Sequence, residues 1–131
     1  MTRLLPKLLL LILSAMVALS GHAGDELAGY WQHESDPVWI EMQPDTGQGV
    51  MVRNDNRPDR IGFLVVTDLE TSDDHNAWSA QVFAARLGEY RKADITLSAD
   101  DRMVFTVKVG FMRRSVEWCR VSEVPPAPND A

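Results

Sequence analysis

The sequence predicts an all-β domain of about eight antiparallel strands that follow one another as a meander. Short runs in which apolar and polar residues alternate recur along most of the chain beyond residue 24. Turn-forming residues interrupt these runs about every ten residues. A meander exposes two edges unless the sheet curls and its first and last strands pair, so we expect a small closed barrel. A two-sheet β-sandwich is the alternative.

The alternation is clearest in the second expected strand, where Val38, Ile40 and Met42 share one face. A turn follows at residues 44–47, where proline suits the first corner and glycine supplies a positive φ. Residues 61–67 are apolar on both faces, so we expect this strand to be the most buried. Residues 86–92 contain a glycine and read as a turn or as a single helical turn. The expected strands span residues 27–34, 38–43, 49–54, 61–67, 77–85, 94–97, 103–109 and 115–121.

The first 23 residues have the three parts of a cleavable secretory signal peptide. Arg3 and Lys7 supply the positive segment, residues 8–19 are almost wholly apolar, and small residues precede the expected cleavage site after Ala23. An apolar run of about 12 residues is too short to span a bilayer. We therefore expect a periplasmic or secreted protein with no membrane anchor after cleavage.

Cleavage would leave one domain over residues 24–122 and a Pro-rich tail over residues 123–131 that we expect to be disordered. It would remove two of the 13 basic residues and none of the 19 acidic ones, which gives a net charge of −8. Such a surface repels a phosphate backbone, so nucleic acid is not expected as a partner. Cys119 is the single cysteine, and we expect it to be a buried, inert thiol.

Two short motifs resemble those of the lipocalin-like (calycin) families of small β-barrels. The first expected strand carries Gly29-Tyr30-Trp31, a G-x-W triplet, and the last ends Trp118-Cys119-Arg120-Val121. In those families an arginine from the final strand packs across the tryptophan of the first strand and closes one end of the barrel. The resemblance implies that Trp31 and Arg120 form this closing pair. The chain departs from a typical lipocalin in its shorter length, the absence of a disulfide and the absence of a clear C-terminal helix.

The sequence contains no recognisable catalytic constellation, so we expect a protein that is not an enzyme and holds no cofactor or metal. Residues 45–47 match the Asp-Thr-Gly of aspartic proteases, but they lie in a turn, and a second such carboxylate is required. The spacing of His33 and His75 matches no metal motif. Cys119 neighbours Arg120, but adjacent strand residues point to opposite faces.

The interpretation that remains is a binding module for a small apolar or weakly anionic ligand. Apolar side chains would line the barrel, and the basic residues Lys108, Arg113, Arg114 and Arg120 form a cluster that could accept one acidic group. The expected ligand-binding residues are Phe63, Trp78, Val82, Phe105, Arg114 and Arg120. The alternative is a protein–protein interaction or inhibitor-type accessory module that uses a surface patch around Trp39, which would face outward if Val38, Ile40 and Met42 face the core.

Overall fold

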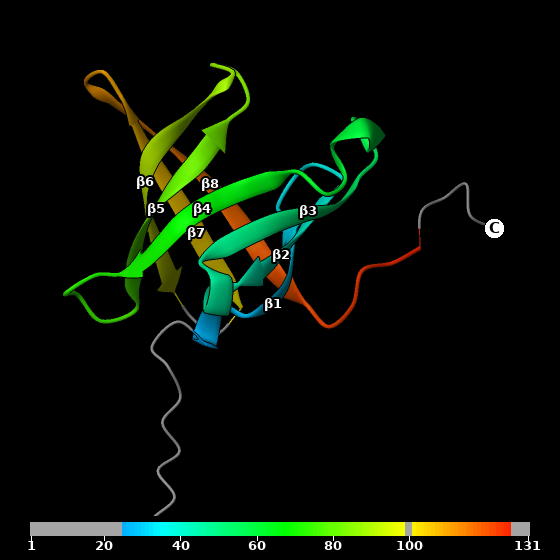
Figure 1. Ribbon diagram of the computed structural model, residues 1–131, viewed down its shortest axis with the longest axis horizontal. Coiled ribbons are helices and arrows are strands. Elements are labelled where there is room, and N and C mark those ends of the chain that lie inside the picture. Colours follow the sequence, from blue (N-terminus) through cyan, green and yellow to red (C-terminus); the bar gives the residue numbers. More distant parts are fainter. Residues whose placement is uncertain (1–24, 99–100, 127–131) are drawn as a thin grey trace, which may run out of the picture.

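The computed structural model describes residues 25–98 and 101–126, which form a closed antiparallel β-barrel (Figure 1). Each strand pairs with the next one along the chain, and β1 also pairs with β8. The all-β, eight-stranded barrel is therefore confirmed, and the sandwich alternative is wrong. The strands are β1 (Gly29–His33), β2 (Val38–Gln43), β3 (Gln48–Asn54), β4 (Leu64–Thr71), β5 (Ala77–Ala84), β6 (Glu89–Ser98), β7 (Arg102–Val109) and β8 (Met112–Val121).

Three short 3₁₀ helices accompany the strands: η1 (Asp25–Leu27) precedes β1, η2 (Pro44–Thr46) joins β2 to β3, and η3 (Pro58–Arg60) lies between β3 and β4. The expected turn at residues 44–47 is present, and Gly47 ends it in the left-handed conformation with φ +71°. The expected signal peptide and cleavage site, and the last residues of the tail from 127 onward, lie outside the described residues.

One contiguous cluster of buried side chains fills the barrel, and every strand contributes to it. Strand alternation brings these residues to the inner face, because neighbours two apart along a strand point the same way. Eight strands enclose a lumen that such side chains can fill. The cluster consists of Leu27, Trp31, Ile40, Met42, Met51, Val65, Val66, Trp78, Ala80, Val82, Ala93, Ile95, Met103, Phe105 and Trp118.

The segment expected to be the most buried strand begins instead with a turn. Ile61 is 56% exposed, and Gly62 adopts φ +92°. The backbone N–H of Gly62 donates to Met51 O at 2.8 Å, and that of Met51 donates to Phe63 O at 2.9 Å. Strand β4 starts only after this connection, and the expectation for residues 61–67 was wrong in its first half. The apolar pattern suggested a continuous strand, but the glycine within it allows the chain to turn before the strand begins.

Two long hairpins extend beyond the core at one end of the barrel. Residues 86–92, which the sequence left open, contain the turn between β5 and β6 and the first four residues of β6. Gly110 turns the chain between β7 and β8 with φ +65°. The ladder between β6 and β7 runs from Ser98↔Arg102 to Ala93↔Val107. Beyond that pair the two hairpins separate, as the diverging strand tips at the top of Figure 1 show. We call this opening the fork.

A meander places alternate connections at opposite ends of the barrel. The β5–β6 and β7–β8 turns therefore lie at one end, which is the fork end. The β2–β3 connection and η1 lie at the other end, which we call the closed end; η1 and η2 are in contact there.

Candidate functional site

Arg120 covers the closed end of the barrel. Its guanidinium carbon lies 4.3 Å from the ring centroid of Trp31, its cross-strand neighbour. Its Nη1 donates to Ala28 O at 3.0 Å and its Nη2 to Glu26 O at 2.7 Å. The buried Trp31 ring donates from Nε1 to Leu27 O at 2.9 Å. The contact that the calycin resemblance implies is present, and it ties the start of the domain to the last strand.

The residues expected around a ligand lie in three different places. Trp78, Val82 and Phe105 are at most 6% exposed and belong to the packed core. Phe63 lies at the edge of that core. Arg114 is exposed on the part of β8 near the fork. Arg120 is on the same strand, but six residues away, or about 20 Å. The basic cluster proposed from the sequence is thus divided between the two ends of the barrel.

Phe63 instead joins an aromatic group on the surface between β4 and β6. Its ring meets that of Phe83 edge-on, with the centroids 4.8 Å apart, and Tyr90 lies 5.4 Å from Phe83. The Tyr90 hydroxyl donates to Leu64 O at 2.7 Å. The guanidinium of Arg60 lies over the Phe83 ring at 5.6 Å. These contacts bind the β5–β6 hairpin to the rest of the barrel below the fork.

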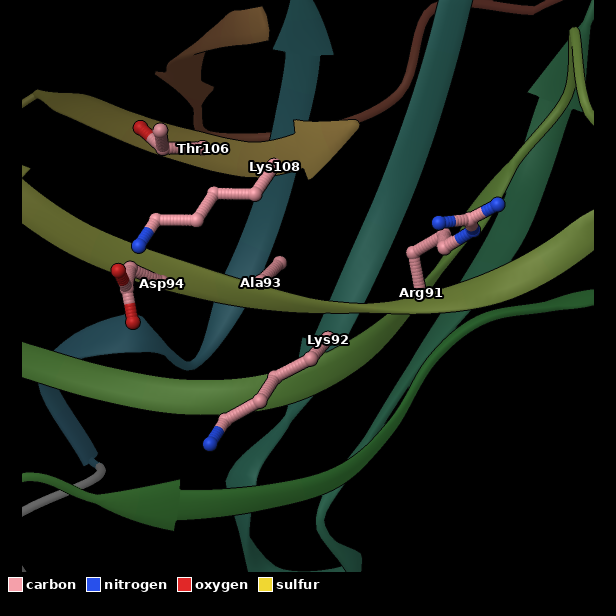
Figure 2. Close-up of a pocket in the computed structure, with 6 residues that line it drawn as sticks. All are labelled: Arg91, Lys92, Ala93, Asp94, Thr106 and Lys108. Carbon is pink, nitrogen blue, oxygen red and sulfur yellow. The ribbon is translucent and has the colours of Figure 1, made fainter. Parts of the chain in front are cut away.

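The fork holds an open hollow of about 430 Å³ between β6 and β7. In Figure 2 the side chains of Thr106, Lys108, Asp94 and Lys92 lie toward the left of the view, and Arg91 lies at the right. The hollow lies at the end of the ladder, beside its last two pairs, Asp94↔Thr106 and Ala93↔Val107. Its size falls within the range of small-molecule sites, about 300 to 1,000 Å³. The lining residues are Arg91, Lys92, Ala93, Asp94, Thr106 and Lys108.

The cations of the fork are less neutralised than those elsewhere on the protein. Arg91 pairs with Glu89 at 2.7 Å. Within the described part of the chain, Lys92, Lys108 and Arg113 take part in no ion pair. Asp94 is the single carboxylate among the lining residues. A bound anion would therefore meet several cationic groups and one opposing charge.

Three arginines outside the fork, Arg53, Arg57 and Arg102, form ion pairs with acidic residues. Two hydrogen bonds from Arg53, each 2.8 Å, lower the pKa of the Asp55 carboxyl. The Glu117 carboxylate, 2.6 Å from Arg102, raises the pKa of that guanidinium. Arg57 pairs with Asp59 at 2.9 Å. Seven of the 11 basic residues beyond residue 24 lie between residues 86 and 114, and all of them except Arg102 lie on the two hairpins near the fork, so the positive charge is concentrated at the fork end.

The tips of the two hairpins expose apolar side chains. Phe111 is 99% exposed, and its neighbour Met112 is 52% exposed. Leu87, in the turn of the other hairpin, is 44% exposed. Arg113 and Arg114 follow directly on β8, and Arg86 precedes Leu87. Each tip thus combines apolar groups with adjacent cations.

Trp39 does not form the exposed patch expected from the alternation of β2, because it is only 5% exposed. Arg53 lies opposite it in the register of β2 and β3 and stacks on its ring at 4.4 Å. Arg53 is held in place by Asp55 and by the carbonyl oxygens of Pro125 and Pro126, at 2.6 and 2.8 Å from its Nη1. The start of the Pro-rich segment therefore packs over this strand pair. The expectation failed because the register that places an arginine on the ring is not visible in sequence.

The other residues considered for chemistry have structural roles or none. Nδ1 of His33 accepts hydrogen bonds from the backbone N–H groups of Ser35 and Asp36 at 3.1 and 3.0 Å, so it organises the β1–β2 turn. Asp45 is exposed within η2, and Cys119 is half-buried. In the described ranges, no three His, Cys, Asp or Glu side chains come close enough to share a metal ion. None of the helices described there has the length and apolar character needed to cross a bilayer.

Comparison with known proteins gives no relative. No family model, curated protein or solved structure matches the chain.

Proposed function

We propose that this protein is a non-catalytic binding module of the calycin type, exported to the periplasm or secreted, which binds a small anionic or amphipathic molecule at the fork. The observation that carries the proposal is the hollow at the end of the β6–β7 ladder, which several cations line on an otherwise acidic protein. The Arg120–Trp31 contact supports the calycin assignment, because the resemblance of the two motifs implies this contact.

The chemistry of the fork favours a carboxylate or phosphate attached to a short apolar body. Lys92 and Lys108 can each donate charge-assisted hydrogen bonds to an anionic oxygen. The hydroxyl of Thr106 adds a polar contact, although it already interacts with Ser115 at 3.2 Å. The aliphatic stems of the two lysines offer apolar surface beside the charge. The fork thus supplies both kinds of contact in one place.

Calorimetric titration with octanoate, and with octanol as its uncharged counterpart, tests this function. We expect octanoate to bind and octanol to bind at least about tenfold more weakly, because a hydrogen bond to a charged group contributes about 1.5 to 3 kcal/mol. Lys108→Gln should weaken octanoate binding by a similar factor. Arg102→Gln removes the same charge at the other end of β7 and should leave binding unchanged. Equal affinities of the two variants for octanoate would contradict the fork as the site.

A second candidate is a ligand that penetrates the barrel. The indole N–H groups of Trp78 and Trp118 are buried and have no acceptor among the described residues. A buried donor left unpaired costs about 1 to 3 kcal/mol, so an acceptor oxygen brought in by a ligand would be stabilised there. Octanoate in the lumen would change the tryptophan fluorescence, whereas binding at the fork would leave it unaltered. The same titration followed by fluorescence therefore separates the two sites.

A further inference from the structure

We propose that the tips of the β5–β6 and β7–β8 hairpins form a docking surface for an anionic lipid bilayer. We call this set the tip surface; it consists of Arg86, Leu87, Phe111, Met112, Arg113 and Arg114. The proposal concerns a surface next to the fork, and it does not depend on a small molecule binding in the fork.

The apolar part of the tip surface is more exposed than folding alone explains. Phe111 occupies the hairpin turn between Val109 and Met112 and is 99% exposed, so it contributes nothing to the core. A turn position of this kind is ordinarily filled by a small polar residue. Leaving a phenylalanine in water forgoes the stabilisation that burial of its ring would provide. The Phe111 ring, at the end of a projecting hairpin, is in a position to insert into the apolar region of a bilayer.

The charge beside these apolar groups selects an anionic surface. Arg113 and Arg114 adjoin Met112, and Arg86 adjoins Leu87. None of these three cations takes part in an ion pair within the described ranges. The net negative charge of the protein does not prevent approach, because salt screens charges beyond about 8 Å at physiological ionic strength. An anionic membrane that approaches the tips therefore interacts mainly with the positive charge located there.

The shape of the tip surface fits a bilayer better than an acidic protein. The two hairpins diverge beyond Ala93↔Val107 and end in separate points (Figure 1). A stable protein interface needs about 800 Å² of continuous complementary surface on each partner. Interfacial lipid binding instead needs apolar groups that reach about 5 to 10 Å into the headgroup region, with cations at headgroup level. Each tip meets that requirement by itself.

Co-sedimentation with vesicles tests the proposal. The protein should bind vesicles of equal parts phosphatidylcholine and phosphatidylglycerol, and not vesicles of phosphatidylcholine alone. Phe111→Ser should weaken binding at least about tenfold, since it removes most of the inserted apolar area. The double variant Arg113→Gln/Arg114→Gln should weaken it about 25-fold, because each cation near an anionic membrane contributes about a factor of five.

Matched controls separate this surface from general adsorption. Ile61→Ser removes another exposed apolar side chain, on the β3–β4 connection, and should bind as the unaltered protein does. Arg57→Gln/Arg102→Gln changes the net charge equally, away from the tips, and should also leave binding intact. Phe111→Leu should retain most of the binding. Failure to bind the mixed vesicles, or equal losses in the control and tip variants, would overturn the proposal; circular dichroism of each variant excludes unfolding as the cause.

Discussion

Arg120 makes three contacts that hold the closed end of the barrel together. Its guanidinium stacks on Trp31 and donates to two backbone oxygens that precede β1. Since β1 and β8 come from opposite ends of the domain, these contacts join the two strands whose pairing closes the barrel. A cation over an indole contributes about 0.5 to 2 kcal/mol, depending on how far it is desolvated.

We predict that Trp31→Ala lowers the free energy of unfolding by about 3 to 5 kcal/mol, because it removes a fully buried tryptophan. Arg120→Ala should cost less, about 1 to 3 kcal/mol, mainly through its two charge-assisted hydrogen bonds. Urea denaturation of both single variants and the double variant measures their coupling, which should be about 0.5 to 2 kcal/mol. Strict additivity would show that the stacking contributes nothing to stability. Arg102→Ala, which breaks an exposed ion pair, should cost less than about 1 kcal/mol.

For single residues, the sequence predicted a contact where a motif identified both partners. It did not predict a contact that depends on the register between two strands. The G-x-W triplet and the arginine of the last strand led directly to Trp31 and Arg120. The alternation along β2 predicted that Trp39 is exposed. This prediction was wrong, because nothing in the sequence indicates that Arg53 lies across from Trp39 and covers its ring. A residue's own strand gives the direction of its side chain, but the neighbouring strand decides what covers it.

Gly49 shows how a single element constrains the barrel wall. It lies on β3 at the point where the register with β4 shifts, between Gly49↔Val66 and Val50↔Leu64. A Cβ at this position would lie 2.8 Å from Met42 Sδ and 3.0 Å from Cβ and Cγ2 of Val66. Methionine can move its terminal atoms, but the branched valine is stiff at χ1 and sits in the core. Glycine is required at position 49 because Met42 and Val66 lie too close to the backbone to leave room for a Cβ atom.

We predict that Gly49→Ala destabilises the domain by about 1 to 3 kcal/mol through overpacking against Val66. Thermal or urea unfolding measures the effect. In a Val66→Ala background, which removes Cγ2 and keeps the Cβ, the same substitution should be less costly. If Gly49→Ala were as harmful in that background as in the unaltered protein, steric contact with Cγ2 of Val66 would not be its cause.

Element by element, the strands that face the core over their whole length could be predicted, and the segments beyond the core could not. Met103 and Phe105 alternate toward the buried cluster, so β7 was recognisable from its apolar period. The first four residues of β6 have no core to face at the fork, and they show no such period. The strand ends near the fork, which form the candidate site, therefore show the weakest alternation of apolar and polar residues.

On the scale of the whole molecule, charge is segregated along the barrel. The sequence shows an acidic protein with basic residues concentrated between residues 86 and 114, and Lys108, Arg113 and Arg114 were recognised as a cluster. Arg91 and Lys92 were missed, because only the pairing of β6 with β7 brings them beside Lys108. Part of the candidate site was thus predictable. The distribution of basic residues along the chain shows where the positive charge lies, but only the strand topology shows which of these residues come together.

This segregation has a consequence that can be measured on the intact domain. A protein with a net charge of −6, or of −8 after the expected cleavage, and with uniformly distributed charge would be repelled by a cation exchanger at pH 7. With its unpaired cations gathered at one end, and with screening over about 10 Å at 0.1 M salt, the protein should bind both a cation and an anion exchanger at low ionic strength. Arg113→Glu/Arg114→Glu should abolish retention on the cation exchanger. Arg57→Glu/Arg102→Glu, which gives the same net charge, should preserve it, because those arginines already face acidic partners. Loss of retention in both variants would mean that net charge, and not its concentration at the fork end, governs how this protein meets a charged surface.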